Sequence, residues 1–89
     1  MFLDKRAKKL MSGDRVTELA NIEMQVRTRL IRLDSATSLE DLRALRGNRL
    51  EALIGVRKGK FSIRINDQYR ICFKWKAEGP ADVEITDYH

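Results

Sequence analysis

The stretch from Phe61 to Trp75 alternates strictly between apolar and polar residues, and this limits the folds open to the chain more than any other feature. A period of two places successive side chains on opposite faces, so it predicts two β-strands in a sheet with one buried face. A short polar segment between the two runs predicts a turn. The apolar positions are Phe61, Ile63 and Ile65 in the first strand, and Tyr69, Ile71, Phe73 and Trp75 in the second.

The length of this turn follows from the need to keep both apolar sets on the same face. A turn made of residues 67–68 alone would set Ile65 opposite Arg70 and would expose one apolar set to water. Because a slip of one residue inverts a strand, the buried face selects a three-residue turn over residues 66–68. The resulting pairs are Ile65 with Tyr69, Ile63 with Ile71, and Phe61 with Phe73.

This register makes Arg64 and Arg70 direct cross-strand neighbours on the polar face of the sheet. Like charges in that position disfavour strand pairing by up to ~1 kcal/mol. Two adjacent guanidiniums suit a bridging anion such as a phosphate, which both can contact. The alternative is a solvated sheet face on which the two arginines point apart, and the spacing leaves both interpretations open.

The size of the chain predicts a single domain over residues 1–89, because 89 residues leave no room for a second core. No apolar run is long enough for a transmembrane segment, and the first residues lack the apolar run of a signal peptide. Cys72 is the only cysteine, which excludes an internal disulfide and is typical of the reducing cytoplasm. His89 is the only histidine, so we expect no zinc site built from histidine and cysteine.

The net charge of +5 is concentrated in the second half of the chain. Between residues 43 and 76 there are ten basic side chains and only two acidic ones, Glu51 and Asp67. Such a distribution is typical of a surface that binds a polyanion, although it does not distinguish RNA, DNA and an acidic protein. The basic residues are Arg43, Arg46, Arg49, Arg57, Lys58, Lys60, Arg64, Arg70, Lys74 and Lys76.

Helices are predicted in the first half of the chain. A short basic helix is expected from about Leu3 to Met11, and apolar residues at steps of three and four predict a longer one from about Thr17 to Leu33. Ser38 and Asp41 have the spacing of a capping box and begin a third, short helix. Gly47 is the expected end of that helix.

The second half predicts four strands. A strand is expected from Leu50 to Ile54, followed by a basic turn over residues 55–60, the hairpin, a turn over residues 76–81 and a last strand from Asp82 to about Thr86. Helices followed by an antiparallel meander indicate an α+β protein, with N-terminal helices packed on one face of a small antiparallel sheet of about four strands.

The chain ends in three side chains that can take part in proton transfer, Asp87, Tyr88 and His89. Histidine is suited to proton transfer near neutral pH, and aspartate can orient an imidazole. The alternative is a frayed polar terminus without a chemical role. Together with Arg64 and Arg70, this tail fits RNA cleavage by the RNA's own 2′-hydroxyl, which needs an acid, a base and cations at the phosphate, and no metal.

Several segments resemble the HigB branch of the RelE/ParE toxin superfamily, and together they cover nearly the whole chain. The resemblance implies the RelE-like microbial RNase fold and a ribosome-dependent endonuclease that halts translation by cutting mRNA in the A site. It also implies a HigA-type helix-turn-helix antitoxin, through which alone the pair would bind operator DNA, and no membrane partner. The segments are KRAKKL (5–10), LDxATSLxDLR (33–43), NRLEALxG (48–55), SIRINDQYRICF (62–73) and VEIxDYH (83–89).

The resemblance also implies roles for individual residues. Arg64 and Arg70 would hold and activate the scissile phosphate, and the reactive tail would be Asp87, Tyr88 and His89. Glu51 stands where some relatives have histidine and is a candidate base. The basic residues expected to contact message or ribosomal RNA are Arg46, Arg49, Arg57, Lys58, Lys60 and Lys74.

Two departures from the family pattern affect the interpretation. Ile54 stands where many relatives have lysine, so we expect modest activity unless Lys58 or Lys60 supplies the missing cation. Relatives also carry a first strand before the position of Phe2, and here that strand is absent or reduced to residues 1–3.

Two other functions are compatible with the same composition. A ParE-like gyrase inhibitor would bind its target without cleavage chemistry, and the terminal Asp-Tyr-His argues against it. A basic RNA-binding accessory domain would bind RNA in a strongly salt-dependent manner and would not be toxic.

Overall fold

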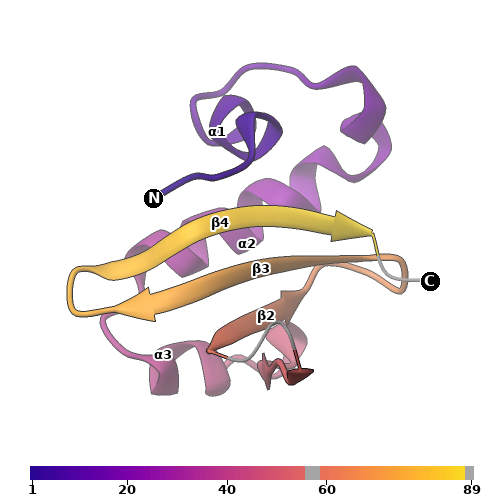
Figure 1. The fold of residues 1–89 in the computed structure, drawn as a ribbon. Coiled ribbons are helices and arrows are strands. Elements are labelled where there is room, and N and C mark those ends of the chain that lie inside the picture. Colours follow the sequence, from indigo (N-terminus) through magenta and orange to yellow (C-terminus); the bar gives the residue numbers. More distant parts are fainter. Residues whose placement is uncertain (56–58, 88–89) are drawn as a thin grey trace.

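Helices cover one face of a four-stranded antiparallel sheet, whose strands follow in the order β1-β2-β3-β4 (Figure 1). The computed structural model describes residues 1–55 and 59–87. This architecture confirms the predicted α+β class. The elements are α1 (Lys5–Met11), the 3₁₀ helix η1 (Thr17–Ile22), α2 (Glu23–Ser35), α3 (Leu39–Arg43), the 3₁₀ helix η2 (Arg46–Asn48), β1 (Glu51–Ala52), β2 (Lys60–Arg64), β3 (Tyr69–Lys76) and β4 (Gly79–Asp87).

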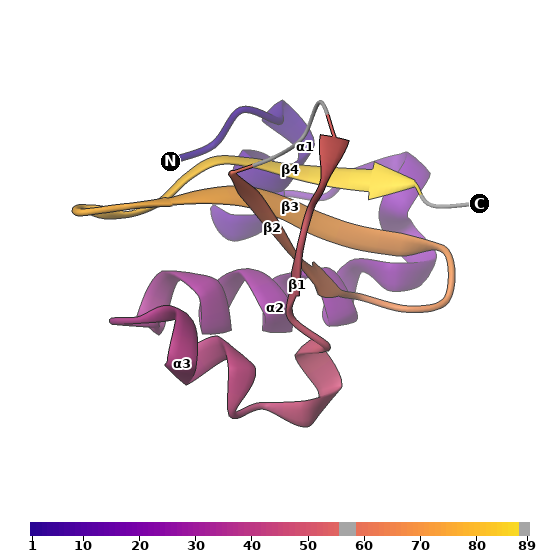
Figure 2. The same cartoon turned by 60° about the horizontal axis from the view of Figure 1, so that its bottom comes forward.

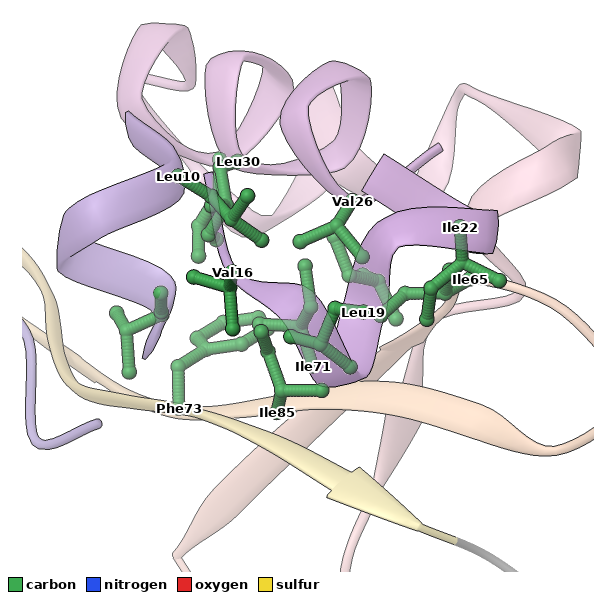
Figure 3. Packing of buried hydrophobic residues seen from close by; sticks show 14 of the residues in the cluster. Leu10, Val16, Leu19, Ile22, Val26, Leu30, Ile65, Ile71, Phe73 and Ile85 are labelled. Carbon is green, nitrogen blue, oxygen red and sulfur yellow. The ribbon is translucent and has the colours of Figure 1, made fainter. Parts of the chain in front are cut away.

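An apolar cluster fills the space between the helices and the sheet (Figure 3). The helical stripe predicted from steps of three and four residues meets the apolar side of the β2–β3 hairpin. Burying each such side chain is worth roughly 1.5–3 kcal/mol, so the cluster is the main source of stability. Its buried members are Ala7, Leu10, Val16, Leu19, Ile22, Val26, Leu30, Leu33, Leu42, Ile63, Ile65, Ile71, Phe73, Val83 and Ile85.

The β2–β3 hairpin has the register predicted from the alternation. The Ile65 amide donates to the Tyr69 carbonyl at 3.0 Å across the turn, and Arg64 lies directly opposite Arg70. The remaining pairs are Lys60 with Lys74, Phe61 with Phe73, Ser62 with Cys72, and Ile63 with Ile71.

The other face of the hairpin is not the fully solvated surface that one interpretation of the sequence allowed. Ser62 and Cys72 are completely buried, and only 9% of Arg70 is exposed. The chain after η2 explains part of this burial, because β1 pairs with β2 and crosses in front of it (Figure 2). The polar residues near this edge are therefore enclosed by their own chain.

The helix predicted from about Thr17 to Leu33 is two helices, and that prediction was wrong in this respect. The 3₁₀ helix η1 precedes α2, and its last residue, Ile22, has φ −124° and ψ 10°, outside the helical range. In a 3₁₀ helix, residues three apart lie on the same side, so Leu19 and Ile22 both reach the core. A spacing of three residues is also compatible with an α-helix, and the sequence did not separate the two.

Two helix ends differ from the prediction. α1 begins at Lys5 rather than near Leu3, because the Asp4 side chain caps the helix by accepting a hydrogen bond from the Arg6 amide. Ser38 caps α3 by accepting from the Asp41 amide, as predicted, but α3 ends at Arg43. Gly47 is therefore not the end of this helix but lies inside η2. The residue that follows η2, Arg49, has a left-handed backbone with φ 43°.

The outer strands also differ in length. The strand predicted for residues 50–54 is reduced to two exposed residues, and Ile54 is 87% exposed. β4 is longer than predicted, because the turn occupies only Ala77 and Glu78 and the strand begins at Gly79. A bulge in the β3–β4 pairing accommodates Asp82, which has φ 51°.

The N-terminal residues join the sheet through a single parallel bridge between Phe2 and Val83. The Val83 amide donates to the Met1 carbonyl at 2.9 Å, and the Leu3 amide donates to the Val83 carbonyl at 3.0 Å. The first strand expected from the family pattern is therefore reduced to one bridge. Among the residues that the structure describes, no helix is long and apolar enough to cross a membrane.

Asp4 connects this N-terminal segment, α1 and β4. Its carboxylate accepts from the Arg6 amide at 2.9 Å, from Arg6 Nη2 at 3.0 Å and from the Ile85 amide at 3.0 Å. Burial raises the pKa of this carboxyl, but these hydrogen bonds outweigh burial and leave the pKa below its ordinary value of 3.8. The ionised form is therefore the one that stabilises the fold.

We predict that Asp4→Asn lowers the free energy of unfolding by about 1–3 kcal/mol at pH 7. Since the folded-state pKa is lowered, the contribution is complete above the unfolded value of ~3.9 and is lost as the pH falls through the folded-state value. Urea unfolding at several pH values measures the difference, which should shrink as the pH falls below the unfolded value and through the lowered folded-state pKa. Asp34→Asn, at an exposed site, is the control; an equal effect of both variants would contradict the prediction.

Candidate functional site

The structure forms a pocket of about 290 Å³ between the β2–β3 turn and the segment that leads into β1. Two segments far apart in the sequence contribute to it: the chain from the end of η2 into β1, and the hairpin from the end of β2 through the turn to the start of β3. We call it the arginine pocket. It is lined by Arg49, Glu51, Arg64, Asn66, Asp67 and Arg70.

Arg70 is the most enclosed charge of the arginine pocket. Its Nε donates to Ser62 Oγ at 2.8 Å, and its Nη2 donates to the carbonyl oxygens of Arg49 at 2.6 Å and Ser62 at 3.4 Å. All of these acceptors are uncharged, and no carboxylate pairs with Arg70 among residues 1–55 and 59–87. Protein atoms thus orient one edge of the guanidinium, while no ion pair with a carboxylate of the described residues compensates its positive charge.

The backbone of Arg49 makes part of this arrangement. Arg49 adopts the left-handed conformation, with φ 43° and ψ 58°, directly after η2. A non-glycine residue rarely occupies this region and does so at a cost of roughly 1–3 kcal/mol, so the surrounding contacts must hold it there. In this conformation the Arg49 carbonyl meets the buried guanidinium of Arg70.

Arg64 differs from Arg70 because it has an acidic partner. Its Nη2 pairs with the carboxylate of Asp67, three residues later in the turn. The Asp67 side chain is 99% exposed, whereas Arg64 is 28% exposed. An exposed ion pair of this kind contributes at most ~1 kcal/mol, so an entering anion can replace Asp67.

The turn itself is held by Asn66, whose Oδ1 accepts from the Gln68 amide at 2.9 Å and from the Tyr69 amide at 2.8 Å. The sequence interpretation did not assign Asn66 or Asp67 to the site. The signal was present, since an asparagine that starts a turn and opposite charges at positions 64 and 67 both indicate local contacts.

Glu51 lines the arginine pocket together with the two arginines that the sequence grouped. It is exposed and lies opposite Ser62 in the β1–β2 pairing. The pocket therefore combines two guanidiniums with a carboxylate that is open to solvent. This is a suitable environment for a phosphate and a group that accepts a proton.

Asp87 does not line the pocket. It is the last residue of β4, lies opposite Tyr69, and its Oδ2 accepts from Gln68 Nε2 at 3.2 Å. Because residues 66 and 67 of the same turn line the pocket, Asp87 ends β4 next to the pocket's turn. Tyr88 and His89 lie outside the described residues, so the structure gives no position for either.

The basic residues predicted to contact RNA are not gathered at one place. Arg49 lines the arginine pocket, and Arg46 is exposed on η2. Lys60 pairs with Glu84 at 3.8 Å, and Lys74 pairs with Asp82 at 3.4 Å, so both are partly neutralised away from the pocket. Arg57 and Lys58 lie outside the described residues.

No group of three or more His, Cys, Asp or Glu side chains that could hold a metal ion occurs in residues 1–55 or 59–87. Cys72 is buried.

We predict that Ser62→Ala lowers the free energy of unfolding by about 1–3 kcal/mol, because it leaves the buried Arg70 guanidinium short of one acceptor. Thermal or urea unfolding measures the change. Ser12→Ala is the matched control, since Ser12 Oγ donates to the Lys8 carbonyl at an exposed site. An effect of Ser62→Ala no larger than that of Ser12→Ala would contradict the prediction.

Comparison with known proteins shows the family to which the chain belongs. The whole chain, residues 1–89, matches the model of the HigB-like RelE-like toxins of type II toxin–antitoxin systems. The chain is also 41% identical over 90 aligned positions to the toxin HigB-1 of Vibrio cholerae serotype O1, covering 99% of this chain and 94% of that protein. An α+β fold of helices on a four-stranded antiparallel sheet agrees with the resemblance found in the sequence. The chain belongs to the HigB-like family of RelE-like toxins of type II toxin–antitoxin systems.

Proposed function

We propose that this toxin is a ribosome-dependent endoribonuclease that cuts mRNA in the ribosomal A site and thereby stops translation. The observation that carries the proposal is the Arg70 guanidinium, enclosed by neutral acceptors and without an acidic partner among the described residues. A buried cation without a counter-ion is costly, and a bound anion offsets that cost. Arg64, directly opposite, offers a second guanidinium to the same anion.

The proposed reaction is a transfer of the phosphate within the RNA strand. The 2′-oxygen loses its proton to a base and forms a bond to phosphorus, while the bond from phosphorus to the leaving 5′-oxygen breaks. The 5′-oxygen takes up a proton from an acid, so protons and electron pairs balance without a metal. Arg64 and Arg70 stabilise the negative charge that grows on the phosphate oxygens.

Proton transfer is assigned to groups around the pocket. Glu51 lines the pocket and is exposed, which supports a role as the base for the 2′-hydroxyl. Asp87 ends β4 beside the turn that lines the pocket, which supports a role for the tail that it begins. In this proposal, the tail of Asp87, Tyr88 and His89 supplies the acid and orients the substrate.

The family also supports proposals about partners. A toxin of a type II system has a cognate antitoxin. We propose that this partner is a HigA-type protein with a helix-turn-helix domain, and that the toxin reaches operator DNA only through it. Because the substrate is message on a translating ribosome, we expect the toxin to act in the cytoplasm.

We predict that Arg64→Ala, Arg70→Lys and His89→Ala each lower mRNA cleavage by about 10²-fold or more, because each removes a contact made to the reacting groups. Primer extension on an abundant message, after induced expression and with purified translating ribosomes, measures cleavage. Arg43→Ala is the control, since Arg43 pairs with Glu40 on α3 away from the pocket. Circular dichroism confirms that each variant is folded.

Intact message on translating ribosomes with the unmodified chain would refute the proposed activity. Double-strand DNA breaks with intact message would instead identify a gyrase inhibitor. Salt-dependent RNA binding without growth arrest would identify an accessory binding domain.

We predict that Ile54→Lys raises the cleavage rate roughly threefold or more, since it adds a cation where many relatives carry one. Ile54 is 87% exposed, so the substitution should leave stability within about 0.5 kcal/mol. Single-turnover cleavage on programmed ribosomes measures the rate, with Ile54→Gln as the neutral control. A rate unchanged in the lysine variant would remove the missing cation as a reason for modest activity.

A further inference from the structure

A second group of cations lies beside the arginine pocket, where α2 faces η2. Arg29 Nε donates to the Arg64 carbonyl at 3.1 Å, and Arg32 Nη1 donates to Asn48 Oδ1 at 3.3 Å. We call these two residues the α2 arginine pair. The sequence interpretation gave neither of them a role at the site.

Both guanidiniums border the same space at Gly47. A Cβ atom added to Gly47 would lie 3.9 Å from Arg29 Nη2 and 3.9 Å from Arg32 Nη1, which is ordinary van der Waals distance. Both arginines are partly exposed, so the space between them is open to solvent. An anion above Gly47 could therefore contact both side chains.

The α2 arginine pair carries two positive charges without an ion-pair partner in the part of the chain that the structure describes. Within residues 1–55 and 59–87, no carboxylate forms an ion pair with Arg29 or Arg32. Partial burial, followed by the positive charges of Arg32 and Arg64, lowers the pKa of the Arg29 guanidinium. By contrast, Arg27 on the same helix pairs with Glu23 at 3.4 Å. The positive charges of Arg29, Arg32 and Arg64 therefore repel one another.

We propose that the α2 arginine pair is a second phosphate-binding position, which takes a phosphate of the RNA strand next to the one held in the arginine pocket. Arg64 connects the two positions, because its side chain lines the pocket while its carbonyl accepts from Arg29. Its charge acts on both anions. The proposal rests on the proposed function, since it assumes that a phosphodiester enters the pocket.

The second position gives the site a reason to prefer a strand over a single phosphate. Each added phosphate contact releases counter-ions from the nucleic acid and strengthens binding at low salt. One phosphate in the pocket would be held by Arg64 and Arg70, and its neighbour by Arg29 and Arg32. A dinucleotide reaches only the first position, whereas a longer strand reaches both.

The test compares two uncleavable RNA probes, a 2′-O-methylated dinucleotide with one phosphodiester and a 2′-O-methylated pentanucleotide. Arg32→Gln removes the charge and keeps a donor for Asn48. It should weaken pentanucleotide binding roughly tenfold and make the slope of the logarithm of the binding constant against the logarithm of the salt concentration shallower by about 0.7. Dinucleotide binding should be unchanged. Arg70→Lys should weaken the binding of both probes, and the control Arg43→Gln should weaken the binding of neither.

Gly47 allows a second and independent variant. Its φ lies outside the left-handed region, so a side chain is compatible with the backbone there. Gly47→Asp should bring a carboxylate between the two guanidiniums, raise the melting temperature and weaken the pentanucleotide alone. Gly47→Asn has the same shape without the charge and should do neither. Opposite changes in stability and RNA binding would not arise from a merely structural arginine pair.

Equal effects of Arg32→Gln or Gly47→Asp on both probes, or no effect on either, would overturn the second position. Pentanucleotide binding no stronger than dinucleotide binding by the unmodified chain would also overturn it. The proposed nuclease activity can fail separately. If the chain binds the pentanucleotide through Arg32 but leaves message intact on ribosomes, the second phosphate position is supported and the cleavage reaction is refuted.

Discussion

The rest of the structure depends on one packing constraint, the burial of a single face of the β2–β3 hairpin. Ile63, Ile71 and Phe73 are fully buried against the helices, and a shift of one residue would turn one apolar set away from the core. The same register places Arg64 opposite Arg70. The packing of the hydrophobic core therefore determines which charged side chains lie opposite one another on the other face of the hairpin.

The charged groups are then distinguished by their surroundings. Arg70 is held by neutral oxygens of Ser62 and Arg49, whereas Arg64 has the exposed carboxylate of Asp67 as its partner. A buried guanidinium without an acid is poised for an anion, and an exposed ion pair is easily exchanged. In the proposed reaction, a phosphate would therefore have to displace Asp67 from Arg64, whereas Arg70 has no acidic partner among the described residues.

The distinction between arginines with and without an acidic partner also applies to α2, outside the pocket. Arg29 and Arg32 lie close to Arg64 and have no acidic partner among the described residues, so like charges accumulate along one side of the molecule. Elsewhere basic residues are neutralised within the sheet, as in the pairs Lys60 with Glu84 and Lys74 with Asp82. Net charge alone does not reveal this division, since every lysine and arginine counts equally in it.

The sequence by itself determined the α+β class, the hairpin register and the pairing of Arg64 with Arg70, because period-two alternation leaves only one register with a buried apolar face. Only the tertiary structure decided that Ser62 and Arg70 are enclosed and that Glu51 lines one pocket with Arg64 and Arg70. These features arise where β1 folds back over the hairpin edge, and they depend on the left-handed backbone of Arg49. Local patterns report which face of an element is apolar, whereas contacts between distant segments depend on how the whole chain packs.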